Sequence, residues 1–121
     1  MKQGRITAAF KEIDRMCGIG GLPFRTISRL YSLRNRMKPL IEAQYDEEMR
    51  IVNELADVDE KGTLSFHEEG GKSVMNTLFN KIQQTEVDWD EKPEEIAYDE
   101  KLGLSGNSLS ALEGFVVIKE D

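Results

Sequence analysis

The chain has 121 residues and a formal net charge of −7, with 39% hydrophobic and 32% charged residues. This length suits one domain, residues 1–121, and the regular spacing of the apolar residues excludes a disordered chain. The acidic balance argues against direct binding of nucleic acid, because phosphates repel it, and favours a basic protein partner. The single cysteine excludes an intrachain disulfide, and no apolar run reaches the roughly 18 residues of a membrane span. We therefore expect a cytosolic protein with no membrane partner.

The first half of the chain predicts two helices. Residues 5–17 carry apolar side chains every three or four positions, and glycines then end the helix. A second, longer helix starts at Leu22-Pro23 and continues to Leu55. Pro39 lies inside it, and because the apolar stripe stays in phase across this residue we expect a kink rather than a break. The first face comprises Ile6, Ala9, Phe10, Ile13, Met16 and Cys17, and the second Ile27, Leu30, Tyr31, Met37, Ile41, Tyr45, Val52 and Leu55.

Shorter elements are predicted in the second half. Turn residues at 57–62 precede a short strand at 63–66, and a third helix at 72–82 buries Val74, Met75, Leu78, Phe79 and Ile82. The remaining elements are strands at 86–90, near Ile96 and Tyr98, and at 115–118, a turn or helical fragment at 99–103, and a short helix capped by Asn107 or Ser108. Together they predict an α+β fold: an N-terminal helical hairpin with a long kinked second helix, packed on a small antiparallel sheet with one or two short helices.

Charge is distributed unevenly, and it changes sign inside the long helix. Residues 1–22 carry a net charge of +2 and residues 23–39 carry +5, whereas residues 40–60 carry −7, residues 61–85 carry +1 and residues 86–121 carry −8. We expect the basic half of the long helix to face the acidic later segments and the acidic half to stay in water. Exposed ion pairs contribute only about 0–1 kcal/mol each, so burial of the apolar stripe must fix the fold.

Two charged sets are candidate binding surfaces. Arg25, Arg29 and Arg36 form a candidate basic stripe on one side of the long helix, which either contacts nucleic acid or pairs with acids of the same chain. The acidic set is the densest charge feature, and it is either a solvated sheet edge that prevents aggregation or a face that presents carboxylates to a basic groove. It comprises Asp88, Asp90, Glu91, Glu94, Glu95, Asp99 and Glu100.

One stretch partly matches a calcium-binding loop. Asp57, Asp59 and Glu68 occupy the first, third and twelfth positions of such a loop. Lys61 occupies the fifth position, where a cation replaces the expected oxygen ligand. These three acids are therefore a weak metal candidate, and we expect a tight turn and no metal or other cofactor.

No other motif predicts catalysis. The run EGGKS at residues 69–73 matches the end of a phosphate-binding loop but lacks its first glycine, so we expect the two glycines to loosen the start of the third helix. His67 is the only histidine, and zinc or triad chemistry needs partners that the sequence does not place beside it or beside Cys17. Acid pairs such as Glu94-Glu95 point apart and lie in solvated stretches. The sequence thus predicts a protein that is not an enzyme.

The order of the features resembles a known family over nearly the whole chain. The segments that carry the resemblance are LP at the start of the long helix, RLYSLRNRMKPLIEAQYDEEMRIVNEL, DEKGTLSF, NTLFNKI, EVDWD and the tail LGLSGNSLSALEGFVVIKED. They resemble a family of small phage and prophage proteins grouped as a domain of unknown function (family 1617). Pro39 and the EEGG stretch depart from the family pattern. The resemblance implies a phage protein in the host cytoplasm or associated with the virion, without catalytic residues.

These observations lead to a functional hypothesis. The chain is predicted to be a non-enzymatic, phage-encoded acidic binding protein that inhibits a host defence protein by occupying its basic surface. The alternative is a tail or virion-assembly accessory protein that acts through helix-mediated docking or self-association. The expected partner is a host nucleic-acid-binding protein or another phage protein, and a homo-oligomer is a third arrangement that the sequence leaves open.

Overall fold

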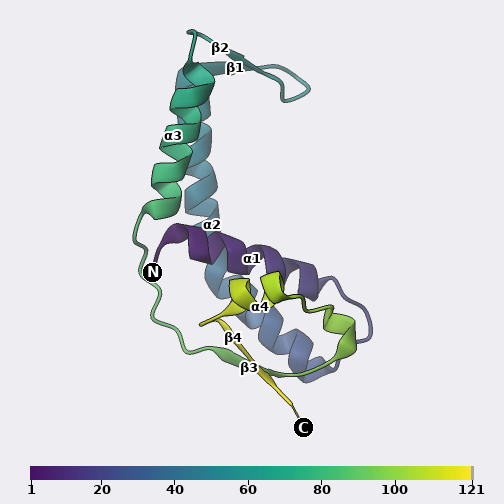
Figure 1. The fold of residues 1–121 in the computed structure, drawn as a ribbon. Coiled ribbons are helices and arrows are strands. Elements are labelled where there is room, and N and C mark those ends of the chain that lie inside the picture. The colour runs from purple at the N-terminus through teal and green to yellow at the C-terminus, as the bar shows by residue number, and fades with distance from the viewer. Residues whose placement is uncertain (121) are drawn as a thin grey trace.

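A computed structural model describes residues 1–120 of the chain. Its helices and strands confirm the α+β class. They are α1 (Gln3–Cys17), α2 (Phe24–Leu55), β1 (Ala56–Val58), β2 (Leu64–Phe66), α3 (Gly71–Gln84), β3 (Glu94–Ala97), the 3₁₀ helix η1 (Glu100–Leu102), α4 (Gly106–Leu112) and β4 (Val116–Lys119). Figure 1 shows two parts, a lobe and an arm that projects from it. Leu40 and Ile41 still pack against the core of the lobe, so the lobe comprises residues 1–41 and 86–120 and the arm residues 42–85.

The lobe is built around the hairpin of α1 and α2. Ile6, Ala9, Ile13 and Met16 have no exposed surface, which confirms the apolar face predicted for the first helix. On α2 this face meets Leu30, Leu33 and Met37, and the C-terminal segment closes the core from the other side with Ile96, Leu102, Leu112 and Phe115. Burial of these side chains is the main source of stability in the lobe, at about 1.5–3 kcal/mol for each large apolar side chain.

Helix α2 is continuous through Pro39 and has 32 residues. Figure 1 shows its axis changing direction between the part that crosses α1 and the part beside α3, which agrees with the predicted kink. The ring of Pro39 is exposed, so it disturbs no packing. The predicted stripe was wrong at Tyr31 and Tyr45, which are 43% and 60% exposed. Leu33 and Ile51 are buried instead, because the lobe and the arm cover different faces of the helix.

The arm consists of the second half of α2, helix α3 and a β-hairpin at its end (Figure 1). Its core is small: Ile51, Val52 and Met75 are buried. Six half-buried apolar side chains surround them, namely Leu55, Leu64, Phe66, Leu78, Phe79 and Ile82. Val74 was predicted to be buried and is 49% exposed, because α3 contacts only one other helix here and its buried face is narrow.

Strand β1 was not predicted, since its residues resemble the end of a helix and the start of a turn. Ala56 pairs with Phe66 and Val58 with Leu64 in an antiparallel register. Asp59 closes the turn, because its Oδ1 accepts hydrogen bonds from the main-chain N–H groups of Lys61 (2.9 Å) and Thr63 (2.8 Å). The hairpin therefore replaces the single strand expected at 63–66.

Three predictions about the C-terminal third were wrong. Residues 86–90 form no strand, only a bridge from Glu86 to Lys2, because Trp89 packs on Phe115 with ring centroids 5.9 Å apart. Strands β3 and β4 pair in parallel rather than in one antiparallel sheet, since η1 and α4 carry the chain back to the starting end of β3. Helix α4 is capped by Ser105, whose Oγ accepts from the N–H of Ser108 (3.1 Å). The predicted caps Asn107 and Ser108 lie inside its first turn.

The two glycines at the start of α3, Gly70 and Gly71, fix the packing of the hairpin and do not loosen the helix start. Gly70 adopts a φ of +83°, which favours glycine. Gly71 is buried, and a Cβ at this position would lie 3.0 Å from Cδ1 and 3.1 Å from Cβ of Phe66. Helix α3 and strand β2 can therefore approach this closely only because residue 71 has no side chain.

We predict that Gly71→Ala lowers the free energy of unfolding by about 1–3 kcal/mol, because the added methyl group overlaps Phe66. Gly20→Ala is the matched control, since no atom lies within 4 Å of its added Cβ and the expected change is within about 0.5 kcal/mol. Urea unfolding of both variants measures the difference. An unchanged midpoint for Gly71→Ala would contradict the packing described here, because alanine is intrinsically the better helix former.

Candidate functional site

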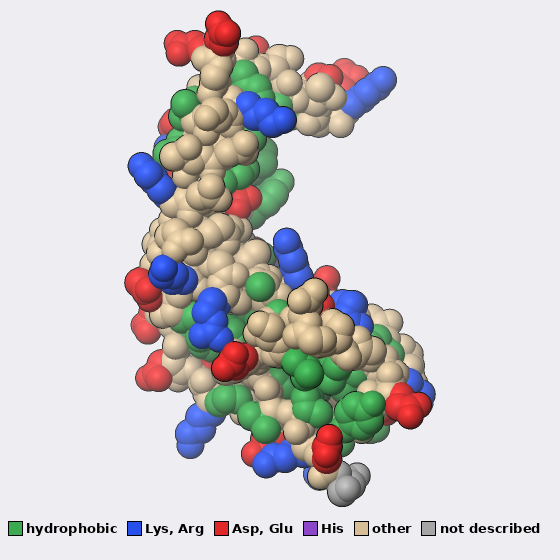
Figure 2. Space-filling view, viewed as in Figure 1, with side chains coloured by type: hydrophobic (Ala, Val, Ile, Leu, Met, Phe, Trp, Pro, Cys, Tyr) green, Lys and Arg blue, Asp and Glu red, His purple; other side chains and the backbone are tan. Residues whose placement is uncertain are grey.

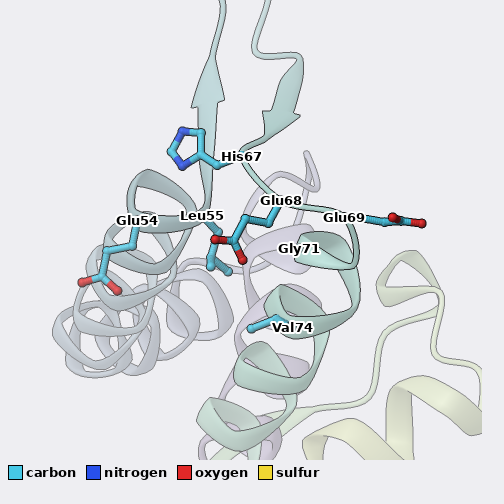
Figure 3. Close-up of a pocket in the computed structure, with 7 residues that line it drawn as sticks. All are labelled: Glu54, Leu55, His67, Glu68, Glu69, Gly71 and Val74. Carbon is cyan, nitrogen blue, oxygen red and sulfur yellow. The ribbon is translucent and has the colours of Figure 1, made fainter.

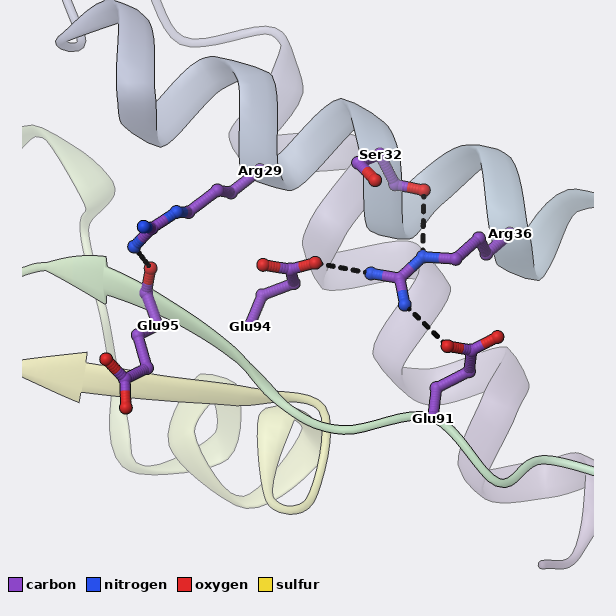
Figure 4. A network of polar contacts seen from close by, with 6 residues as sticks. All are labelled: Arg29, Ser32, Arg36, Glu91, Glu94 and Glu95. Carbon is purple, nitrogen blue, oxygen red and sulfur yellow. Dashed lines mark hydrogen bonds and ion pairs between the residues drawn. The ribbon is translucent and has the colours of Figure 1, made fainter.

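The basic half of α2 faces the segment that carries the predicted acidic set. Arg36 donates to Glu91 (2.8 Å) and Glu94 (2.6 Å), and its Nε donates to the carbonyl of Ser32 (3.4 Å). Arg29 donates to the carbonyl of Glu95 at the outer edge of β3. Figure 4 shows these side chains between α2 and the strand, so two of the three arginines of the candidate basic stripe contact other parts of this chain. Arg25 is exposed, and its side chain makes no hydrogen bond or ion pair with another described residue.

The seven acids predicted to form a binding face do not stay free as one set. Glu91 and Glu94 are paired with Arg36, and Glu95 lies 3.5 Å from the ammonium group of Lys119. Asp99 caps η1 by accepting from the main-chain N–H of Lys101 (2.9 Å). The members that form neither an ion pair nor a side-chain hydrogen bond within residues 1–120 are Asp88, Asp90 and Glu100. This face therefore presents fewer free carboxylates to a partner than its sequence suggests.

The lobe is nearly neutral and the arm is acidic. Residues 1–22, 23–39 and 86–121 carry +2, +5 and −8, which gives −1 for the lobe when the charge of Asp121 is counted with it. Residues 40–60 and 61–85 carry −7 and +1, which leaves the arm with −6 of the total of −7. The sequence contains this signal in the acidic run of residues 40–60. What it does not show is that the other acidic run is neutralised by the basic half of α2.

Six arm carboxylates are exposed and form no ion pair within the described residues: Glu42, Asp46, Asp59, Glu60, Glu68 and Glu69. Others are engaged along the helix, since Arg50 pairs with Glu47 (2.6 Å) and Glu54 (2.7 Å), and the hydrogen bond from Arg50 lowers the pKa of Glu47. Figure 2 shows carboxylates around the end of the arm, where the hairpin meets α3. These acids belong to a projecting element, so they are accessible from several directions.

A hollow of about 190 Å³ lies at this end of the arm. Figure 3 shows Glu68 between the ends of α2 and α3, with His67 beside it on the hairpin side. Glu54 and Glu69 also line the hollow, while Leu55, Gly71 and Val74 supply the apolar part of the wall. Figure 3 shows the carboxylate of Glu69 directed away from Glu68, and Glu54 already pairs with Arg50, so Glu68 supplies the unpaired carboxylate of the hollow. A carboxylate beside an apolar wall matches the side chain of a lysine or arginine, which has an apolar stem and a charged head.

The candidate metal ligands do not meet. Asp57 pairs with His67, with Nε2 and Oδ1 3.1 Å apart, and Asp59 closes the hairpin turn. Glu68 lies in the hollow at the other end of the hairpin. In the described part of the chain, no group of three or more His, Cys, Asp and Glu residues is placed to hold a metal ion.

Cys17 and His67, which triad chemistry would need side by side, lie in different parts of the molecule. Cys17 packs against the core of the lobe, where burial raises the pKa of its thiol and so reduces the thiolate at neutral pH. His67 lies on the arm, beside the hairpin.

In residues 1–120 no helix is long and apolar enough to cross a membrane.

Comparisons with protein-family models, with curated proteins and with solved structures found no match to this chain. The resemblance to small phage proteins therefore stays a prediction. The binding surfaces must be argued from the geometry of the molecule itself.

We predict that Arg36→Gln lowers the free energy of unfolding by about 1–2 kcal/mol, because it breaks two partly buried ion pairs and leaves Glu91 and Glu94 facing each other. Arg25→Gln removes the same charge from an exposed side chain without a partner, and it should change stability by less than about 0.5 kcal/mol. Urea unfolding at low and high salt measures both variants. The difference between them should shrink as salt rises, and equal effects at low salt would show that the pairs add nothing.

Proposed function

We propose that this protein is a non-catalytic binding protein whose acidic arm occupies a basic surface on a protein partner. The observation that carries the proposal is the separation of charge between a nearly neutral lobe and a projecting arm with a net charge of −6. The partner class is a protein that handles nucleic acid, because such proteins bear basic grooves. The arm presents carboxylates in place of phosphates, so binding blocks access of nucleic acid to the groove.

The shape of the arm supports this function. A narrow element of two helices and a hairpin enters a groove more deeply than a flat face does (Figure 1). Its concentrated charge steers a basic partner and raises the association rate, which falls as salt increases. Exposed Tyr45, Val58 and Val74 supply apolar contacts among the carboxylates, and such contacts slow dissociation. The hollow beside Glu68 is proposed to take one basic side chain of the partner.

The biological setting that we propose is inhibition of a host defence protein by a phage protein in the host cytoplasm. This part of the proposal is supported by the family resemblance described above. The alternative, a tail or virion-assembly accessory protein, is favoured by one observation. The arm has a thin core with six half-buried apolar side chains, and docking of another phage protein on α2 and α3 would bury them further.

We predict that two matched variants separate the arm from the lobe. The arm variant carries Asp46→Asn, Glu60→Gln, Glu68→Gln and Glu69→Gln, and the lobe variant carries Asp88→Asn, Asp90→Asn, Glu100→Gln and Glu120→Gln. Each removes four exposed carboxylates that form no ion pair among the described residues, so both variants have the same net charge. With a partner captured from host cells and then purified, the arm variant should bind about 10²-fold more weakly and the lobe variant within about threefold of the wild type.

The same partner allows a competition experiment. Wild-type protein should displace a duplex DNA or RNA ligand from the partner, and its affinity should fall as salt rises. Equal weakening by the two variants would point to net charge alone. If neither variant and no increase in salt changed the affinity for the partner, the proposal would be contradicted. Docking through apolar surface would then be favoured. Enrichment of the protein in purified virions would favour the assembly role.

A further inference from the structure

Strand β4 has one open edge. It pairs only with β3, and among the described residues β3 is the one element that lies along it. Parallel strands are normally buried in larger sheets, so a pair of this size with a free side is unusual. An open edge presents unpaired main-chain N–H and C=O groups, which are a template for another strand.

The hydrogen bonds to β3 identify which residues form this edge. The N–H groups of Glu94 and Tyr98 donate to the carbonyls of Phe115 and Lys119, both at 2.9 Å. Alternate residues of a strand direct their main-chain groups to opposite edges, so residues 115, 117 and 119 face β3. The residues that face away are Val116, Ile118 and Glu120, and their main-chain groups form no hydrogen bond within residues 1–120.

An apolar hollow adjoins the open edge. It has a volume of about 470 Å³ and is lined by Tyr98, Leu104, Leu109, Ile118 and Glu120. Tyr98 is 56% exposed and Leu109 is 50% exposed, which is unusual for two large side chains beside a core. Figure 2 shows hydrophobic side chains gathered on the lobe between α4 and the end of β4. A strand added to β4 would cover the side of this hollow that Ile118 and Glu120 form, so the edge and this side of the hollow together form one docking site.

We propose that β4 of a second copy of this chain occupies the site, antiparallel and across a two-fold axis. Charge favours this occupant, because copies that meet through their lobes approach with −1 each and keep the arms with −6 apart. The strand is also suited to pair with itself, since Val116, Val117 and Ile118 are β-branched and lie next to one another. The result is a four-stranded sheet in the order β3, β4, β4, β3, with a self-complementary interface.

The open edge fixes the register. An axis at Ile118 pairs all three outward residues, because Val116 then lies opposite Glu120 of the second copy and Ile118 lies opposite itself. On the exposed face of the sheet, Val117 lies opposite Lys119 of the second copy. Val117 is 40% exposed, so its side chain is free to be changed without disturbing the core. This proposal does not depend on the function of the arm.

Opposite charges placed at residue 117 test the register. Val117→Lys puts two like charges across the interface, and by symmetry it does so twice, so the dimer dissociation constant should rise about tenfold. Val117→Glu places a carboxylate opposite each Lys119, and the constant should fall by a similar factor. Inside one copy the effects are reversed, because residue 117 pairs with Glu95 across β3 and β4. Loss of folding therefore cannot produce the expected order of affinities.

Sedimentation equilibrium of the full chain from micromolar to millimolar concentration measures the dimer, and amide hydrogen exchange of Ile118 locates it. Protection of this amide should increase with protein concentration, while that of Val117 should stay constant because it already faces β3. A monomer at every concentration would overturn the proposal, and so would a dimer that responds equally to both substitutions. The proposal would also be overturned if the amide of Ile118 became protected only when a different protein was added. That result would show that another partner occupies the open edge.

Discussion

The architecture depends on one mismatch of length. Helix α1 has 15 residues and helix α2 has 32, which correspond to about 22 Å and about 48 Å. The apolar face of α1 can therefore cover less than half of its partner. Ile6, Ala9, Ile13 and Met16 bury that part together with the C-terminal segment, and the remainder of α2 must find another partner. Helix α3 and the hairpin are this second partner, and together with the remainder of α2 they form the arm. A polar layer lies at the base of the arm, where Gln44 of α2 accepts from Gln3 (2.9 Å) and Thr7 (2.6 Å) of α1.

The distribution of charge matches the division into lobe and arm but does not cause it. The basic half of α2 lies in the lobe, where the acidic C-terminal segment returns and pairs with Arg36. Exposed or half-exposed pairs contribute about 0–1 kcal/mol each, far less than the burial of the α1 face, so they orient the segment rather than hold it. The acidic half of α2 lies in the arm, where α3 has no acid and only two lysines to offset it. A sign change along one helix thus becomes a separation of charge between two parts of the molecule.

The sequence predicted most reliably where one face of an element has one partner. The face of α1 was read correctly because its spacing corresponds to a single buried surface. The stripe of α2 failed at Tyr31 and Tyr45, since a helix that passes from one core to another has no single buried face. Residues 86–90 alternate as a strand does, but Trp89 and Phe115 pack as side chains without a paired backbone.

The acidic set was overestimated for a related reason. Its neutralising partner, Arg36, lies 55 residues from Glu91 and 58 from Glu94, and spacing along the chain does not reveal such a contact. The acids near residues 40–60 were visible in the charge pattern, yet only the fold shows that they project from the lobe. Carboxylates that pair with groups of the same chain are not free to bind a partner, and the sequence does not show which ones these are.

The two surfaces lie at different ends of the molecule, and this placement connects them. Figure 1 shows the hairpin at the end of the arm and the C-terminal end of β4 at the opposite end of the lobe. Two copies joined through β4 would carry their arms outward, with both hollows beside Glu68 left open. A partner with two basic grooves, or two neighbouring partners, would then meet two arms at once, and the second contact would form at a high effective concentration. The neutral lobe is what permits this arrangement, because a dimer joined through the arms would bring together the acidic residues that a basic partner needs to reach.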